Sequence, residues 1–262
     1  MLADVESRTG KPVELRPEPQ LDGRARGTYA VSDPDRSRHL LLYDPAKIDL
    51  LDHIVPHELG HVEMFESADP AGRLVPVVVE QDRQLARKNL LRELVATRRV
   101  LPSTSVSPVT DLWIDGTVGQ LANFPADIAI EQDLWRLHPE LRGAQRRALE
   151  LTAVEGHEAL QPQVVEYTPE TVLTAVNSMN YAFLKSVSRF LGQPWMVRPY
   201  EKTPYKAVGE DLLSMFAAGQ PATLAGGISI SADWAARLGV KEWVRWMRVD
   251  RVAPNAGRLW TS

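Results

Sequence analysis

The sequence predicts an α+β fold in which a small N-terminal β-hairpin or sheet packs on a mainly helical domain. Three observations support this. The β-prone segments lie within the first 43 residues, apolar residues recur at helical spacing from residue 50 to residue 191, and the chain shows no internal repeat or linker. We therefore expect one domain over residues 1–262, with a core of about 25–192 and a C-terminal elaboration at 193–262.

The N-terminal strands are predicted from alternation and turn residues. Pro12–Arg16 alternates between apolar and polar side chains, and Gly27–Val31 is rich in β-prone residues. The turn-forming segment Ser32–Ser37 separates Gly27–Val31 from the apolar run His39–Tyr43. This order predicts a hairpin that is closed by Asp44-Pro45.

The helices are predicted from apolar stripes and from their stop signals. Apolar residues from Leu50 to Phe65 recur at helical spacing and predict the first helix, which Pro56 is expected to kink or restart because proline lacks a backbone N–H. A second helix covers about 80–101 and is followed by the polar loop Ser103–Pro108. A third helix begins near Pro125 and ends at Leu137.

Two further helices are expected at about 140–160 and 169–191, the second of which is stopped by Gly192 and Pro194. In the last seventy residues, Gly226–Trp234 resembles a turn or short strand that leads into a capped helix. The several tryptophans of this region could belong to the core or to an interaction face.

Composition excludes several classes of protein. Hydrophobic residues make up 44% of the chain and charged residues 24%, values typical of a soluble globular protein. The formal net charge of -4 predicts neither nucleic acid nor an anionic membrane as a partner. There is no cysteine, so any metal must be held by histidine and carboxylate side chains. No N-terminal signal or membrane-spanning run is recognisable, and we expect a cytoplasmic protein.

The segment His57-Glu58-Leu59-Gly60-His61 carries the strongest chemical signal, because it matches the H-E-x-x-H pattern of zinc hydrolases. Side chains four residues apart share one face of a helix. His57 and His61 can therefore each place a ring nitrogen about 2.0–2.1 Å from one Zn²⁺. Glu58 would lie beside the metal, where it can act as a general base toward a metal-activated water. Gly60 would let another element pass close by.

The third zinc ligand is expected to be a carboxylate from a later helix. Asn123, Asp127 and Glu131 recur every four residues among apolar neighbours, and buried charges are costly unless they are paired or bound to metal. We expect Glu131 to bind zinc and Asp127 to orient a ligand histidine, with Asp127 as the alternative ligand. Glu93 is a weaker candidate, since arginines surround it. The stripe could also be the exposed side of an amphipathic helix.

Two other side chains of the helical region have open roles. His53 lies four residues before His57, but His53 and His61 are about 12 Å apart along a helix that rises 1.5 Å per residue. We therefore expect His53 to be a core or surface residue and not a third ligand on the same ion. Tyr181 is a possible donor to an oxyanion.

On these residues the chain resembles the zincin metallopeptidases, and more narrowly a small bacterial gluzincin-like group in which a β-hairpin precedes the H-E-x-x-H helix. The resemblance covers about residues 25–140. The chain is also similar to the zinc domain of bacterial regulator-cleaving peptidases, for which Glu93 through Pro102 gives the nearest match. The segment around Asn123 and Asp127 resembles metallopeptidase-like proteins that carry asparagine and aspartate on the ligand helix. These resemblances imply different third ligands.

The resemblance implies a zinc-dependent metallopeptidase that hydrolyses peptide bonds, with Glu58 as general base and a peptide or protein as substrate. The alternative is a catalytically inactive zincin-like scaffold that acts as a metal-stabilised binding or regulatory protein.

Overall fold

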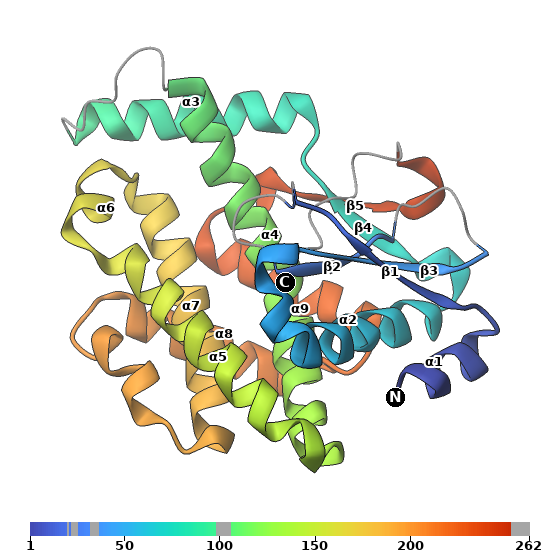
Figure 1. Cartoon of the computed structure of the whole chain (residues 1–262). Coiled ribbons are helices and arrows are strands. Elements are labelled where there is room, and N and C mark those ends of the chain that lie inside the picture. The colour runs from blue at the N-terminus through green and yellow to red at the C-terminus, as the bar shows by residue number, and fades with distance from the viewer. Residues whose placement is uncertain (20, 22–25, 32–36, 98–105, 253–262) are drawn as a thin grey trace.

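The computed structural model describes residues 1–19, 21, 26–31, 37–97 and 106–252. The chain is mainly helical and carries two small sheets, so the predicted α+β class is confirmed at this level (Figure 1). The helices are α1 (Leu2–Thr9), α2 (Leu51–Glu66), α3 (Glu80–Ala96), α4 (Val106–Leu137), α5 (Arg142–His157), α6 (Pro162–Tyr167), α7 (Glu170–Leu191), α8 (Tyr205–Ala218) and α9 (Leu224–Leu238).

The predicted N-terminal strands form one sheet, made of β1 (Val13–Pro17), β2 (Gly27–Tyr29) and β3 (His39–Tyr43) in the order β1-β3-β2. Strands β2 and β3 pair antiparallel, as expected for a hairpin, and the predicted turn at residues 32–36 lies outside the described residues. Strand β1 pairs with β3 in parallel, which the sequence pattern did not indicate. The described faces of β2 and β3 are largely buried, and β2 lies against α2.

Helix α2 runs through Pro56 without ending there, so the predicted restart is wrong. Proline removes one backbone hydrogen bond, at a cost of about 3 kcal/mol. Apolar side chains on both sides of it, including Ile54, Leu59 and Val62, are almost fully buried. Each such burial contributes about 1.5–3 kcal/mol, which offsets the lost bond and keeps the helix in one piece.

Helix α4 begins at Val106 and not near Pro125, so the predicted start is wrong by several turns. The predicted loop before it is only partly described: residues 103–105 lie outside the described residues, and residues 106–108 are helical. Pro125 stands inside the helix, whose earlier turns bury Ile114, Val118 and Leu121. This apolar face explains why the helix extends through and beyond the proline.

The predicted helices at 140–160 and 169–191 are confirmed as α5 and α7, and Gly192 ends α7 with a left-handed φ of 67°. The segment Gly226–Trp234, expected to be a turn or short strand, lies inside α9 instead. The Thr223 hydroxyl accepts a hydrogen bond from the Gly226 backbone N–H and caps the start of this helix.

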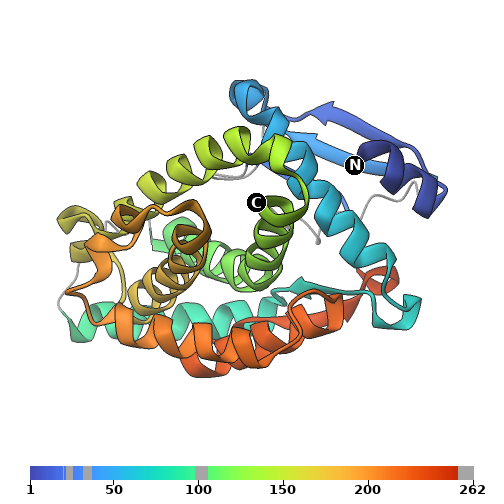
Figure 2. The same cartoon turned by 90° about the horizontal axis from the view of Figure 1, so that it is seen from below.

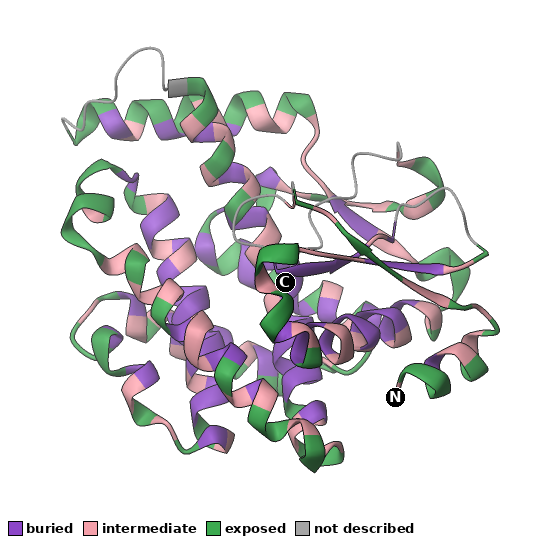
Figure 3. Ribbon diagram, in the orientation of Figure 1, coloured by how far each residue is buried: buried purple, intermediate pink, exposed green. Residues whose placement is uncertain are grey.

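The C-terminal region shares the main hydrophobic core. Trp234 and Trp243 are buried together with apolar residues of α4 and α7, and α8 packs along α7. Strand β5 (Arg245–Arg248) pairs antiparallel with β4 (Leu74–Val77). Buried residues gather on the faces that these elements turn toward one another, whereas α3 is exposed along much of its length (Figure 3). Buried apolar residues from the described part of residues 193–262 therefore contribute to the main core.

The crossing of α2 and α4 brings the two predicted functional segments together. Figure 2 shows α4 near the centre of the helical part, with other helices around it. At the crossing, a Cβ added to Gly60 would lie 2.7 Å from Ile130 Cγ2. Gly60 therefore permits the close approach that the sequence suggested, because any larger residue would push Ile130 away.

None of the helices in the described ranges is both long enough and apolar enough to cross a membrane.

The Gly60–Ile130 contact predicts that Gly60→Ala lowers the free energy of unfolding of the metal-free protein. Overpacking costs about 1–3 kcal/mol, and the better helix propensity of alanine recovers only up to about 1 kcal/mol. The matched control is Gly116→Ala, at an exposed position of α4 where an added Cβ meets no atom within 4 Å; it should be stabilising. Urea unfolding measures both, and equal stabilisation by the two substitutions would contradict the contact.

Candidate metal centre

The candidate site lies where α2 faces α4. Helix α2 supplies His53, His57 and His61, and α4 supplies Asp127 and Glu131, all of them buried. Taking charged groups out of water is unfavourable unless partners replace the lost hydration. The five side chains meet this requirement by contacting one another, in two groups of three that share His57.

The first group consists of His57, His61 and Asp127. The two Nε2 atoms are 3.2 Å apart, and Asp127 Oδ1 lies 3.4 Å from His57 Nε2 and 3.0 Å from His61 Nε2. Ligand bonds of about 2.0–2.1 Å in tetrahedral geometry place donor atoms about 3.3 Å apart. The three atoms therefore already have the mutual spacing of ligands to one ion.

The bonding state of Asp127 agrees with this interpretation. Among the described residues, no donor gives Asp127 Oδ1 a hydrogen bond of acceptable geometry, although two ring nitrogens lie close to it. Buried carboxylate oxygens are normally satisfied. An ion shared by the three atoms would satisfy this oxygen.

The second group, His53, His57 and Glu131, has the spacing of hydrogen bonds. Glu131 Oε1 lies 2.7 Å from His57 Nδ1 and 2.8 Å from His53 Nε2. Gln145 of α5 donates to Glu131 Oε2 at 2.5 Å and to the Glu131 carbonyl at 2.8 Å. These distances are shorter than the spacing of tetrahedral ligands and typical of charge-assisted hydrogen bonds. Glu131 therefore orients His57.

The two groups together give His57 a defined orientation. When His57 Nδ1 carries a proton and donates it to Glu131, the lone pair of the neutral ring is left on Nε2. Nε2 is the atom that faces His61 and Asp127. The buried groups of this site could hold a metal ion, and the donor set of two imidazoles and one carboxylate suits a divalent transition metal.

The charges of the site shift its pKa values in the metal-free protein. Burial alone would lower the pKa of His57, but the carboxylates of Asp127 and Glu131 outweigh it and hold the pKa well above 6.5. For Asp127 and Glu131, burial would raise the pKa, yet the neighbouring histidines bring both pKa values below those of ordinary carboxyl groups. The site is thus a buried pair of carboxylates that attracts cations.

Of the carboxylates expected as third ligand, Asp127 is the one beside both Nε2 atoms, whereas Glu131 contacts the other nitrogen of His57. Within the described chain Glu93 belongs to neither group. Glu93 accepts hydrogen bonds from the Thr171 backbone N–H at 3.0 Å and from its hydroxyl at 2.8 Å, and so caps the start of α7.

Tyr181 makes its side-chain hydrogen bond to a residue outside these two groups. Its hydroxyl donates to Glu210 of α8, and burial together with that carboxylate raises the pKa of Tyr181. The expected role as oxyanion donor therefore has no support from these contacts. His53 is a buried histidine that binds Glu131 and not a ligand of the first group, in line with the helix-geometry argument.

Sequence reasoning missed Gln145. It is a buried residue of α5, and no spacing in the sequence links it to Glu131, because the contact depends on how α5 packs.

Glu58 follows His57 on α2 and is buried, and its side chain lies next to Gly27 of β2. A Cβ added to Gly27 would lie 3.5 Å from Glu58 Cγ and only 2.4 Å from Ile54 Cγ2. The backbone of β2 thus packs closely against the side of α2 that carries Ile54 and Glu58.

Comparison of the chain with models of known protein families, with curated proteins and with solved structures gives no significant match.

The arrangement predicts that Asp127→Ala removes tight metal binding, whereas Glu131→Ala lowers the affinity by about 10–100-fold, the usual effect of losing a group that orients a ligand. Competition with a chromophoric chelator measures both affinities. The control is Asp133→Ala on the same helix, at a half-exposed side chain that pairs with Arg136, and it should bind metal as the wild type does. A larger loss for Glu131→Ala than for Asp127→Ala would make Glu131 the ligand.

Metal binding should release protons near neutral pH. Because the carboxylates of Asp127 and Glu131 raise the pKa of His57 well above its ordinary value in the metal-free protein, the ring keeps its second proton to higher pH than a free histidine and must lose it before Nε2 can bind an ion. Apparent affinity should therefore fall by up to about tenfold per pH unit as the pH decreases below that pKa. Calorimetric titrations in two buffers of different ionisation enthalpy count the protons. Heats that do not depend on the buffer would contradict the raised pKa.

Proposed function

We propose that the protein is a zinc-dependent metallopeptidase that hydrolyses peptide bonds in a peptide or protein substrate. The observation that carries the proposal is the triangle of His57 Nε2, His61 Nε2 and Asp127 Oδ1, with Glu58 next to His57 on the same helix. The H-E-x-x-H motif and a carboxylate from a second helix are the donor pattern of catalytic zinc sites. In this proposal Asp127 is the third ligand and Glu131 orients His57.

Zinc suits the residues present. The chain has no cysteine, so a closed thiolate site of the structural type is not available. Two imidazoles and one carboxylate leave a fourth tetrahedral position for water or substrate. Bound there, zinc would supply a Lewis acid that polarises a carbonyl group and makes a water molecule more acidic.

Glu58 supplies the acid–base chemistry in this proposal. Its carboxylate accepts the proton of the attacking water and later returns it to the amine of the leaving group. Burial keeps bulk water from this carboxylate, so that its charge acts in a medium of low dielectric constant. The close wall formed by Gly27 of β2 would limit how a substrate approaches Glu58.

A second candidate function is a metal-stabilised scaffold that binds a partner without catalysis. The specific observation in its favour is burial: the relative exposure of His57, Glu58 and His61 is only 4%, 2% and 4%. A substrate carbonyl must reach the open position of a catalytic metal, and an enclosed metal that only stabilises the fold needs no such access.

The substitution Glu58→Gln separates the two functions. It keeps the size of the side chain but removes the base, so it should leave zinc stoichiometry unchanged and lower the cleavage rate by about 10²–10⁴-fold. Elemental analysis gives the metal content, and profiling of new N-termini in a protein extract gives the cleavage. Glu63→Gln, on the same helix at the ion pair with Arg8, is the matched control and should cleave normally.

Cleavage by Glu58→Gln at the wild-type rate would contradict the role of Glu58. Stoichiometric zinc without cleavage by the wild type would favour the scaffold. Iron in place of zinc would remove the basis for a zinc hydrolase, since iron(II) also binds two histidines and a carboxylate.

A further inference from the structure

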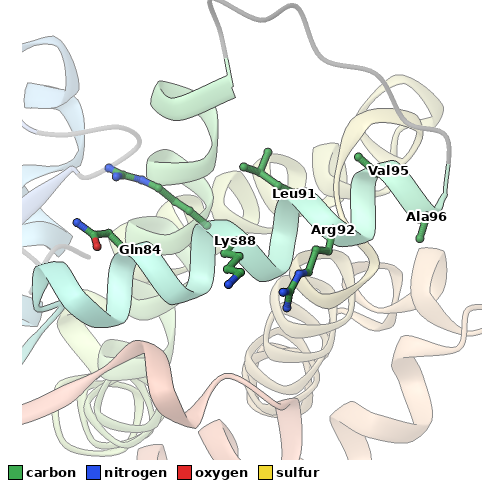
Figure 4. A pocket seen from close by; sticks show the side chains of 7 residues that line it. Gln84, Lys88, Leu91, Arg92, Val95 and Ala96 are labelled. Atoms are coloured by element: carbon green, nitrogen blue, oxygen red, sulfur yellow. The ribbon is translucent and has the colours of Figure 1, made fainter.

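The outer face of α3 (Glu80–Ala96) carries exposed cations beside exposed apolar side chains. Lys88, Leu91, Arg92 and Val95 occupy positions i, i+3, i+4 and i+7 of this helix, so they share one face. All four are exposed, and Val95 has 78% of its surface accessible. Together with other α3 residues they line a hollow of about 600 Å³, which Figure 4 shows from close by.

The charge of this face comes from two cations that the fold does not neutralise. Arg83 and Arg87 of α3 are bound by Asp111 and Asp115 of α4, with N–O distances down to 2.5 Å. These pairs leave Lys88 and Arg92 with no carboxylate in ion-pair contact among the described residues. The face therefore combines two available positive charges with two apolar side chains.

Helix α3 is held firmly despite its exposure. Its inner face buries Ala86, Leu90 and Leu94, the pairs with α4 fix one half, and Glu93 bonded to Thr171 fixes the other. The outer face is thus presented on a rigid support, which lowers the entropic cost of binding a partner.

We propose that this face, consisting of Lys88, Leu91, Arg92 and Val95, docks an acidic amphipathic helix of another protein. Such a helix would place leucine-type side chains on Leu91 and Val95, and carboxylates one turn apart opposite Lys88 and Arg92. We infer an acidic partner because its carboxylates would complement the charges of Lys88 and Arg92. The same charge pairs would determine the orientation of the bound helix.

Other occupants fit less well. An anionic membrane or a nucleic acid needs more than two cations, since each contributes only about 1 kcal/mol near a membrane surface, and the whole chain has a net charge of -4. Residues 98–105, which follow this face in sequence and lie outside the described ranges, contain arginine and no acidic residue. Residues 253–262 contain no acidic residue either.

The docking face is separate from the metal centre. Asp115, which binds α3, and Asp127 are 12 positions apart on α4, about 18 Å along a helix that rises 1.5 Å per residue. The inference therefore stands independently of the proposed hydrolysis, and its test needs no cleavage.

The test uses a fluorescent 18-residue synthetic helix with leucine along one face and glutamate flanking it, and a second peptide in which lysine replaces each glutamate. Fluorescence anisotropy measures binding to the full chain at low salt. The double variant Lys88→Glu/Arg92→Glu should bind the acidic peptide at least about tenfold more weakly than the wild type, because two attractive pairs become repulsive. High salt should reduce the difference.

The matched control is Arg198→Glu/Lys202→Glu, which reverses two exposed cations four residues apart elsewhere on the molecule. It should bind as the wild type does, and thermal unfolding should show that both double variants remain folded. Equal binding by all three proteins, or equal affinity for the lysine peptide, would overturn the proposal. Binding to anionic lipid vesicles that depends on Lys88 and Arg92, with no binding of the acidic peptide, would also overturn it.

Discussion

The close crossing of α2 and α4 is the constraint on which the rest of the site depends. Gly60 removes the side chain that would keep the helices apart, and Ile130 fills the space above it. Because Ile130 stands between Asp127 and Glu131 on α4, this contact determines how far each carboxylate lies along the histidine face of α2. A buried carboxylate or imidazole is unfavourable without a partner, and the helix crossing supplies these partners. The polar cluster is therefore stable only where the two helices cross closely.

Distances within the cluster separate two roles that residue types alone do not. Contacts of 2.5–2.8 Å around Glu131 are hydrogen bonds, and three donors hold that carboxylate in place. Separations of 3.0–3.4 Å among His57, His61 and Asp127 match donor atoms around one ion. Glu131 is held in place and in turn orients the His57 ring, so that His57 Nε2 faces His61 Nε2 and Asp127 Oδ1. The centre is thus preorganised for a cation before one binds.

Much of this centre could be predicted from the sequence. The H-E-x-x-H spacing predicted that His57 and His61 lie together, and the polar stripe on an apolar helix predicted that α4 supplies the carboxylates beside them; the role of Glu58 stays a prediction. Which of Asp127 and Glu131 lies beside both Nε2 atoms could not be predicted, because the two are four residues apart on the same face and a shift of about 6 Å along the helix exchanges their positions. The early turns of α4, the helical Gly226–Trp234 segment and the parallel pairing of β1 depend on packing between distant segments, which local patterns do not contain. Pro56 and Pro125 do not mark helix boundaries, because the apolar side chains buried on both sides of each proline outweigh the one backbone hydrogen bond that it removes.

The most direct measurement of the central claim is a crystal structure of the zinc-loaded protein with anomalous data collected on both sides of the zinc absorption edge. The account predicts one anomalous peak about 2.0–2.2 Å from His57 Nε2, His61 Nε2 and an Asp127 oxygen, with Glu131 still bound to His57 Nδ1. A peak between His53, His57 Nδ1 and Glu131, or the absence of any peak at the crossing of α2 and α4, would contradict it.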